Sequence, residues 1–493
     1  MVHVQRILLV CSIGTIIWSW IVSFVVVPVP VRADMNDEHP INDDVLIAPS
    51  SAERRRRLTD DTISSQKRQQ SQSEHNLSLL EKVHKEHLSL FTISESIVTL
   101  GPTVFPKPTH IFENENDIVT YIQPVHSNHR PESDAIFLFA AEYALQNYLV
   151  FLTTLRDTGY DGDVVMAISA MDWAKDDVKE YLQHDPHVIV YVVQYECYNA
   201  EGEAVESAKG GIRVCKQDHL FGRRKSGDGT IVEPLPDPRH LRTLQNSRYE
   251  LYWIWSEKYH AYSWIMLIDA RDTFFQRNPF DWVPRRQKQF DDAGGILLFF
   301  GENVDATRLG QSAHNRDWLT KAYGLHVAEA LVDKPTICSG STMGEQVAIE
   351  MYLRAMVMES DETRTVKMGA DQGFHNRLYY SNKLANAKAI QKIIVQDQGY
   401  GIVNNLGALR TKPLDQWGNS KLLDIERATK EGVETNPDNV VKNMTVRNWD
   451  GRVSPVVHQF DRHAEFSNLY FKKKWREIRQ RWDASKKLQA EKR

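Results

Sequence analysis

Residues 263 to 280 read Ser263-Trp-Ile-Met-Leu-Ile-Asp-Ala-Arg-Asp-Thr-Phe-Phe-Gln-Arg-Asn-Pro-Phe280. The run that begins at Trp264 is apolar up to Asp269, which is typical of a strand covered on both faces in an α/β sheet. A carboxylate at the end of a buried strand costs free energy unless a cation, hydrogen bonds or water compensate it. Asp269 and Asp272 are well placed to hold a divalent ion, since ligands of open α/β sheets bind at the carboxyl edge. We therefore expect this stretch to form the floor of an active site.

Short apolar strands alternate with amphipathic helices before this stretch. Strands are predicted at 135–140, 163–169 and 188–193, with helices at 143–156 and 173–183. This alternation predicts an α/β fold with a central, mostly parallel sheet flanked by helices. No G-x-G-x-x-G follows the first strand and no Walker pattern occurs, so the sequence supports neither a dinucleotide site nor a P-loop.

Composition excludes several classes of protein. The chain has 493 residues, 42% of them hydrophobic and 25% charged, which is ordinary for a soluble globular protein. The net charge of -5 gives no overall attraction to nucleic acid. Four cysteines are too few for a disulfide scaffold, and no C-x-x-C zinc spacing exists.

The N-terminal residues predict the compartment. Residues 7–27 contain no charge and follow Arg6, so we expect a membrane helix at 7–29 with residues 1–6 in the cytoplasm. The alternative is a cleaved signal peptide, with small or apolar residues at the cleavage positions around Ala33. Both interpretations place the remainder in the secretory lumen. Residues 30–130 are polar and weakly periodic, and predict a largely disordered stem.

Other features agree with a lumenal location. Asn76 and Asn443 begin glycosylation acceptor triplets. Cys197 and Cys215 flank a polar excursion; they either pair in an oxidising compartment or remain free thiols. The arginine cluster at 53–57 is either a solvated part of the stem or a processing site.

Three segments after residue 239 carry further candidates. A helix is predicted at 240–259, and its Arg248 is either a surface residue or a ligand that reaches a diphosphate. Small residues in the segment 336–344, among them Ser339 and Gly340, would let the backbone approach a ligand at the entrance of the next helix.

Asp371 and His458 can each be interpreted as structural or as functional residues. Asp371 stands near the start of a predicted helix and is either a cap or a contact to sugar or acceptor. His458 follows an apolar pair, so it is either a satisfied core residue or a metal ligand. Residues 471–493 predict a basic C-terminal helix that packs by one face or touches a membrane.

Together these segments resemble glycosyltransferases of the GT-A fold, the nucleotide-diphospho-sugar transferase superfamily. The resemblance covers a domain at 131–470. Its carriers are Asp-Ala-Arg-Asp at 269–272, Cys-Ser-Gly-Ser-Thr-Met-Gly at 338–344, Ala-Asp-Gln-Gly-Phe-His-Asn at 370–376 and His-Gln-Phe-Asp-Arg-His at 458–463. In that superfamily, an Asp-x-Asp motif after a central strand holds manganese and the nucleotide.

The resemblance implies roles for named residues. By this resemblance, Asp269, Asp272 and His458 would be the ligands of a Mn²⁺ or Mg²⁺ ion. The second acid of Asp-x-Asp is replaced by Arg271, which could bind phosphate directly. The nucleotide-sugar contacts implied are Asp269, Arg271, Asp272, Ser339 and Gly340, and the catalytic candidates are Asp371 and Arg248.

The implied function is transfer of a sugar from a nucleotide-sugar donor to a glycan or glycoprotein acceptor. The expected location is the Golgi membrane, as a single-pass type II protein with a lumenal catalytic domain, or the secretory lumen if the N-terminal segment is cleaved. The main alternative is a non-catalytic lumenal binding or scaffold domain, for which Arg271 is the best argument. A haloacid-dehalogenase-type phosphatase is a weaker alternative, because its Asp-x-Asp-x-Thr spacing is not met and several strands precede Asp269.

Overall fold

The computed structural model describes residues 71, 89–199, 202–205, 214–224, 231–285, 294–412, 414, 417, 445–463, 467 and 472–492. The expected membrane helix, the arginine cluster and the triplets at Asn76 and Asn443 lie outside these residues. In the part of the chain that is described, no helix has both the length and the apolar character needed to span a bilayer.

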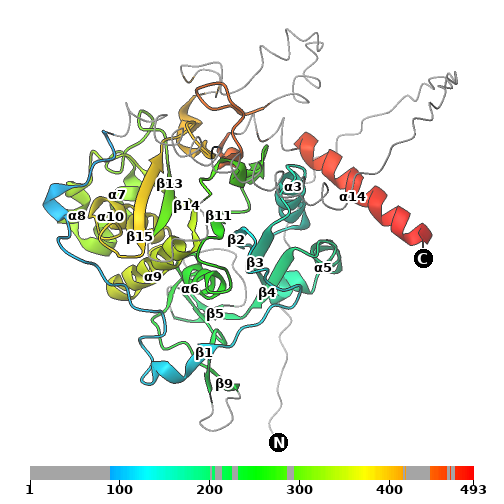
Figure 1. Cartoon of the computed structure of the whole chain (residues 1–493), viewed down its shortest axis with the longest axis horizontal. Coiled ribbons are helices and arrows are strands. Elements are labelled where there is room, and N and C mark those ends of the chain that lie inside the picture. The colour runs from blue at the N-terminus through cyan, green and yellow to red at the C-terminus, as the bar shows by residue number, and fades with distance from the viewer. Residues whose placement is uncertain are drawn as a thin grey trace, which may run out of the picture. The chain divides into compact units, whose positions relative to one another are not determined.

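Seven strands form the central sheet (Figure 1). They are β2 (Ala135–Phe139), β3 (Asp163–Ser169), β4 (Val188–Val193), β11 (Trp264–Ile268), β13 (Gly295–Gly301), β14 (Ile337–Glu345) and β15 (Ile390–Gln396). Their order is β15-β13-β14-β11-β2-β3-β4. Only β14 runs antiparallel to its neighbours within this sheet. The predicted mostly parallel sheet is confirmed, and the strand that ends at the acidic pair is its middle strand.

Strand β11 is covered on both faces, as its sequence predicts. All five of its residues are buried. Trp264, Met266 and Ile268 contribute to one hydrophobic core, whereas Ile265 and Leu267 contribute to the other. Because successive side chains of a strand point to opposite faces, an unbroken apolar run serves both cores at once.

Helices cover both faces of the sheet. On one face lie α3 (Leu145–Arg156) and α5 (Asp176–Gln183), whose buried side chains belong to the first core. On the other lie α6 (Leu244–Ser256), α9 (Gln346–Thr363) and α10 (Ala370–Tyr380), which fill the second core. The sheet therefore leaves its strand ends, rather than its faces, for ligands.

Strand β14 corrects one expectation. The small residues of the segment 336–344 are expected to bring the backbone close to a ligand at the entrance of the next helix, but Ile337–Glu345 is a nine-residue strand between β11 and β13. Its glycines relieve crowding inside the sheet: a Cβ on Gly344 would lie 2.7 Å from the Ile296 carbonyl oxygen. The register pairs Ile268 with Ser341, and the Asp269 amide donates to the Gly340 carbonyl at 3.0 Å.

The polar excursion after β4 contains a small second sheet. Its strands are β5 (Tyr195–Tyr198), β6 (Ala204–Val205), β7 (Val214–Gln217) and β10 (Arg242–Thr243). Cys197 and Cys215 face each other on β5 and β7 and form a disulfide, which confirms the pairing interpretation. Strand β10 also accounts for the later start of α6, which begins at Leu244 rather than at residue 240.

The folded part begins earlier than residue 131. Phe91 and Phe105 are buried in the second core, and the Ser94 amide donates to the Tyr380 carbonyl at 2.9 Å. Residues 89–130, assigned from the sequence to the stem, therefore belong at least in part to the folded domain.

The C-terminal helix α14 (Lys472–Lys492) packs against α3 (Figure 1). Trp482 meets Tyr181 edge to face, with ring centroids 5.0 Å apart, and Arg481 forms an ion pair with Asp157 at 2.8 Å. Of the two interpretations of this helix, packing by one face is the one that its contacts support.

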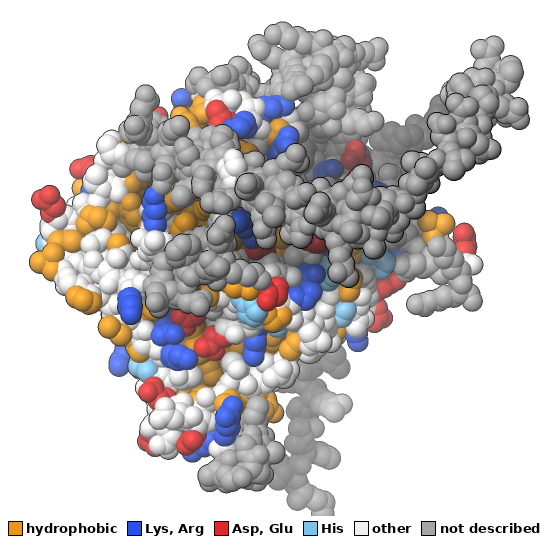
Figure 2. Space-filling model, in the orientation of Figure 1, with side chains coloured by type: hydrophobic (Ala, Val, Ile, Leu, Met, Phe, Trp, Pro, Cys, Tyr) orange, Lys and Arg blue, Asp and Glu red, His pale blue; other side chains and the backbone are white. Residues whose placement is uncertain are grey.

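The charge on the surface is mixed. On the face shown in Figure 2, Lys and Arg side chains alternate with Asp and Glu side chains and form no large patch of one sign.

Candidate active site

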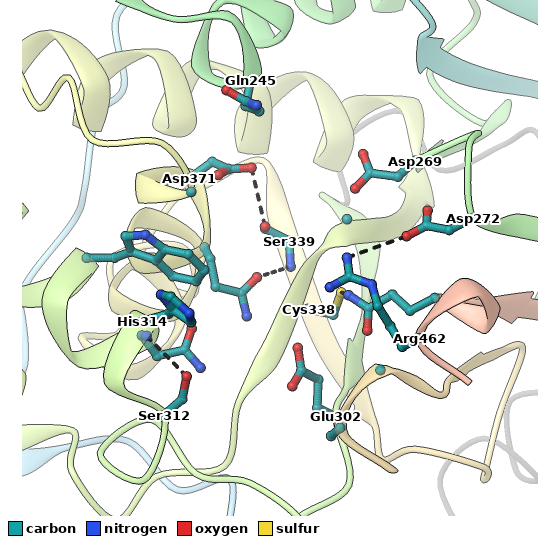
Figure 3. A pocket seen from close by; sticks show the side chains of 18 of the residues that line it. Gln245, Asp269, Asp272, Glu302, Ser312, His314, Cys338, Ser339, Asp371 and Arg462 are labelled. Carbon is teal, nitrogen blue, oxygen red and sulfur yellow. Dashed lines mark hydrogen bonds and ion pairs between the residues drawn. The ribbon is translucent and has the colours of Figure 1, made fainter. Parts of the chain in front are cut away.

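A cavity of about 820 Å³ opens at the carboxyl edge of the central strands (Figure 3). The end of β2, residues after β2, β11 and β13, the start of β14 and the first turn of α10 line it. They include Phe139, Tyr143, Asp269, Asp272, Glu302, Ser339 and Asp371. Roughly 300–1,000 Å³ is the usual size of a small-molecule site. All eight site residues predicted from the sequence are at or beside this cavity, and His458 alone does not line it directly.

The two acids reach the cavity by different routes. Asp269 directly follows β11, whereas Asp272 directly precedes β12 (Thr273–Phe275). Strand β12 pairs with β17 (Val456–His458), and the register sets Thr273 opposite His458. This pairing brings His458 Nε2 to 3.7 Å from Asp272 Oδ1. The acidic pair and the late histidine are therefore neighbours, as the resemblance implied.

Hydrogen bonds determine which nitrogen of His458 is free. The Asn405 side-chain nitrogen donates to the Gly301 carbonyl at 2.9 Å, which leaves Asn405 Oδ1 to accept from His458 Nδ1 at 2.8 Å. With its proton on Nδ1, the ring carries a lone pair on Nε2, which is buried and has no hydrogen-bond partner among the described residues. A metal-ligating histidine has this arrangement, with the second nitrogen fixed by a carbonyl or carboxylate.

Gly340 leaves room between these side chains. A Cβ at this position would lie 2.7 Å from Asp269 Oδ2 and 2.9 Å from His458 Cε1. As the side chains stand, no three His, Cys, Asp or Glu groups of the described residues are drawn together into a metal site. Two carboxylates, an imidazole with a free lone pair and an open space between them nevertheless fit a divalent cation such as Mn²⁺ or Mg²⁺.

The pKa values of the two acids shift in opposite directions. Burial would raise the pKa of Asp269, but the positive charge of Arg248 and the hydrogen bond that it donates outweigh burial and hold the pKa of that carboxyl below its ordinary value. Burial raises the pKa of Asp272, and the negative charge of Asp269 raises it further. Asp269 is thus the more readily ionised of the two acids.

Arg248 lies inside the protein rather than on its surface. Its two terminal nitrogens pair with Asp269 and, at 2.9 Å, with Asp371. The guanidinium therefore bridges the acid after β11 and the acid at the start of α10. Because both terminal nitrogens are occupied, this geometry supports positioning of the two acids better than the direct diphosphate contact expected from the sequence.

Asp371 and Gln372 fasten α10 to β14. Asp371 Oδ2 accepts from Arg248, from the Tyr249 hydroxyl at 3.3 Å and from the Ser339 hydroxyl at 3.3 Å. The Gln372 amide oxygen accepts from the Ser339 amide at 2.7 Å. The helix N-cap is Gly369, so Asp371 does not act as the cap. The Asp-Gln pair holds Ser339 in place at the floor of the cavity.

Sequence reasoning missed Glu302 and assigned no role to Arg462. Glu302 directly follows β13 and its carboxylate faces the cavity (Figure 3). Burial raises the pKa of Glu302 to about 7, although the charges of Arg410 and Arg462 oppose this. The signal was available, because Glu302 follows a buried apolar strand in the same way as Asp269.

Two arginines lie beside Asp272 at the cavity. Arg462 Nη2 is 3.8 Å and Arg271 Nη2 is 3.9 Å from Asp272 Oδ2. Arg271 is also 3.4 Å from Asp461, and its side chain is 54% exposed. Both cations therefore remain accessible to an anionic ligand bound next to the acids.

No protein-family model and no curated protein matches the chain. Several solved structures resemble it, and two of them are structures of LgtC. One is an active-site mutant of LgtC, with a TM-score of 0.31 and 11% identity over 66% of this chain and 86% of that one. The other is the galactosyltransferase LgtC in complex with donor and acceptor sugar analogues, with a TM-score of 0.31 and 12% identity over 70% of this chain and 99% of that one. A likeness at this level carries no conclusion about substrate or mechanism.

Proposed function

We propose that this protein is a metal-dependent glycosyltransferase that moves a sugar from a nucleotide-sugar donor to a glycan or glycoprotein acceptor. The observation that carries the proposal is the convergence of Asp269, Asp272 and the unpartnered His458 Nε2 beside a cavity at the carboxyl edge of the central strand. Ligands of open α/β sheets bind at this edge.

The strand order suggests where the donor lies. The sheet grows outward in opposite directions from β2 and β11, so the crevice between their carboxyl ends is the switch point at which nucleotides bind. Phe139 and Tyr143 line the cavity on the β2 side. The nucleoside is therefore assigned to the β2 side and the diphosphate to the region of Asp269, Asp272 and the two arginines.

The residues at the diphosphate match the charge that the reaction develops. Breaking the bond between sugar and diphosphate leaves negative charge on the departing phosphate. A divalent cation held by Asp269, Asp272 and His458 would stabilise that charge as a Lewis acid. Arg462 and Arg271 lie near enough to add hydrogen bonds and positive charge.

The proposed location is the secretory pathway, with the Golgi membrane as the expected site. The support is the uncharged N-terminal run at 7–27 and the disulfide between Cys197 and Cys215, which is typical of an oxidising compartment.

A screen for donor turnover tests the proposed function. The full-length protein, purified in a mild detergent, is expected to release nucleotide from at least one of UDP-glucose, UDP-galactose, UDP-N-acetylglucosamine, GDP-mannose and GDP-fucose when manganese is present. Chelation with EDTA should abolish release, and added manganese should restore it. A scaffold domain, the alternative that Arg271 favours, would release nothing from any donor.

Glu302 is the best-placed group to accept the proton of an acceptor hydroxyl, because Asp371 is already engaged by three donors. The Glu302→Gln variant is expected to lower transfer by about 10²- to 10⁴-fold. In the wild type, transfer should rise with pH through about 7, where Glu302 becomes deprotonated, and the variant should lack this rise.

The same pKa predicts a change in stability with the opposite sign. Because the folded state holds the Glu302 proton more tightly than the unfolded state, wild-type stability should fall between pH 4.5 and about 7 and then level off. Urea denaturation of wild type and Glu302→Gln across this window measures the difference. A variant that keeps the same pH dependence of both transfer and stability would contradict the role of Glu302.

A further inference from the structure

The cavity has a second half that the proposed metal and diphosphate do not use. Helix α7 (Ala313–Tyr323) begins there, and its His314 and Trp318 both line the cavity. They stand one helical turn apart, with ring centroids 5.8 Å from each other and ring planes only 24° apart. Together these two rings form what we call the aromatic shelf. His314 is exposed and Trp318 is half-buried, so the shelf presents ring surface to the cavity.

The Trp318 ring of the shelf packs against the backbone at Gly369. Gly369 adopts a left-handed conformation with φ of 86°, and a Cβ at this position would overlap the Trp318 indole. The indole can lie against the chain only because residue 369 has no side chain. The start of α7 is fixed as well, because the Ser312 hydroxyl accepts from the Asn315 amide at 3.3 Å. The shelf is therefore a built surface and not a pair of loose side chains.

The residues next to the shelf that line the cavity are polar and uncharged, because Arg316 and Asp317 of α7 do not line it. Gln311 and Ser312 line the cavity next to it, and Gln245 faces the cavity from α6. In Figure 3, His314 and Ser312 lie on one side of Ser339, and Asp269, Asp272 and Arg462 lie on the other. The cavity is thus divided by the start of β14 into a charged half and an aromatic, amide-rich half.

We propose that the aromatic shelf is the acceptor subsite and that it binds the pyranose ring of a neutral sugar. One face of a pyranose presents C–H groups, which favour the electron-rich face of an aromatic ring, while its hydroxyls need amide and hydroxyl partners. The shelf with Gln311, Ser312 and Gln245 supplies both kinds of contact. This inference rests on the proposed function and names the substrate class that its acceptor half takes.

Two other occupants fit the position less well. A nucleobase also stacks on aromatic rings, but its diphosphate must reach the charged half, and the β2–β11 crevice on that side already offers Phe139 and Tyr143. The transferred sugar is bonded to the diphosphate, so it belongs next to Asp371 and Ser339, between the two halves. The shelf lies beyond that point, where an acceptor would meet the transferred sugar.

Saturation-transfer NMR on the full-length protein tests the shelf without any donor turnover. The probes are methyl glycosides of mannose, galactose, glucose and xylose, each measured with manganese and with or without saturating UDP or GDP. At least one glycoside is expected to receive saturation, and neither nucleotide should displace it. His314→Ala and Trp318→Leu should each weaken binding of that glycoside by about three- to tenfold, the value of an aromatic stacking contact.

Matched controls are available on the same domain. His326 is an exposed histidine on α8 (Leu325–Ala330), and Trp173 is a half-buried tryptophan; neither lines the cavity. His326→Ala and Trp173→Leu should leave glycoside binding within about twofold of wild type, a difference of roughly 0.4 kcal/mol. His314→Ala keeps the test valid if Trp318→Leu fails to fold, because His314 is exposed.

Three results would overturn the shelf as an acceptor subsite. The first is that none of the four glycosides binds, and the second is that His314→Ala binds its glycoside as tightly as wild type does. The third is displacement of the glycoside by UDP or GDP together with weaker nucleotide binding in His314→Ala, which would identify a nucleobase site. The third result would leave the proposed transferase function intact. Glycoside binding without turnover of any nucleotide sugar would instead refute the transferase function and leave the shelf as a sugar-binding site.

Discussion

The Asp269→Asn variant is expected to lose transfer by about 10²- to 10³-fold or more, because it removes charge stabilisation at the point where the diphosphate departs. Asp269 is the more readily ionised of the two acids, since the charge of Arg248 and its hydrogen bond outweigh the effect of burial on the pKa of Asp269. An asparagine has nearly the same shape but offers a metal only a neutral oxygen. Initial rates of nucleotide release and of transfer, measured over a range of manganese concentrations, report the loss.

A matched control separates charge at the site from charge in general. Asp157 is also paired with an arginine, Arg481, and its side chain is 39% exposed, close to the 37% of Asp269. Asp157→Asn should therefore transfer sugar at the wild-type rate. Thermal unfolding should show both variants folded, because Arg248 keeps its second partner, Asp371, when Asp269 is neutralised. Full transfer by Asp269→Asn would remove the assignment of the metal and diphosphate site.

Arg248→Met is expected to lower the free energy of unfolding by about 3–5 kcal/mol, the usual cost of removing one partner from a buried ion pair. The arginine is 9% exposed and lies between two carboxylates, one of which, Asp371, is 5% exposed. Methionine fills a similar volume but leaves both acids without their cation. Urea denaturation measures the loss, and transfer should fall with it because the two acids are no longer held together.

Two further variants check that explanation. Arg481 forms an exposed ion pair with Asp157, so Arg481→Met should cost less than about 1 kcal/mol. Asp371→Asn introduced into Arg248→Met should recover part of the lost stability, because it neutralises the buried charge that the first substitution leaves unpaired. If Arg248→Met unfolds at the same urea concentration as Arg481→Met, Arg248 is not the cation that holds the site together.

The sheet was predictable because its strands are buried on both faces. The bounds of β3 and β4 agree with the sequence prediction residue for residue, and β11 ends one residue before the predicted end. Apolar runs with polar boundaries leave little freedom in where such a strand begins and ends. For the same reason Asp269 was recognisable as an acid placed at the edge of a core.

Strand β14 was not predictable because its sequence resembles a loop. Gly340 is crowded by Asp269 and His458, and Gly344 by Ile296 and Leu297 of β13, and that crowding exists only after the sheet has formed. Small residues are typical of both close backbone packing and loops, and one sequence cannot separate the two causes.

Contacts between residues far apart in the sequence were predictable only from the resemblance to the GT-A glycosyltransferases. The pairing of β12 with β17 places His458 beside Asp272, and nothing near either residue encodes that register. The bridge from Arg248 to Asp371 likewise joins the middle of one helix to the start of another. Residue types indicate which groups need partners, but the tertiary fold decides which partners they receive.

The antiparallel direction of β14 has a consequence for how specificity can diverge. Because β14 runs antiparallel to β13, it begins at the edge of the sheet where the cavity opens. The connection between the two strands, residues 302–336, therefore lies at the cavity as one continuous segment that begins at Glu302 and contains α7 and α8. The acids and the late histidine come from elsewhere in the chain. Exchange of this one connection between related proteins would therefore change the ligand group that is recognised in the aromatic half of the cavity. The acids and the histidine in the charged half would keep their positions.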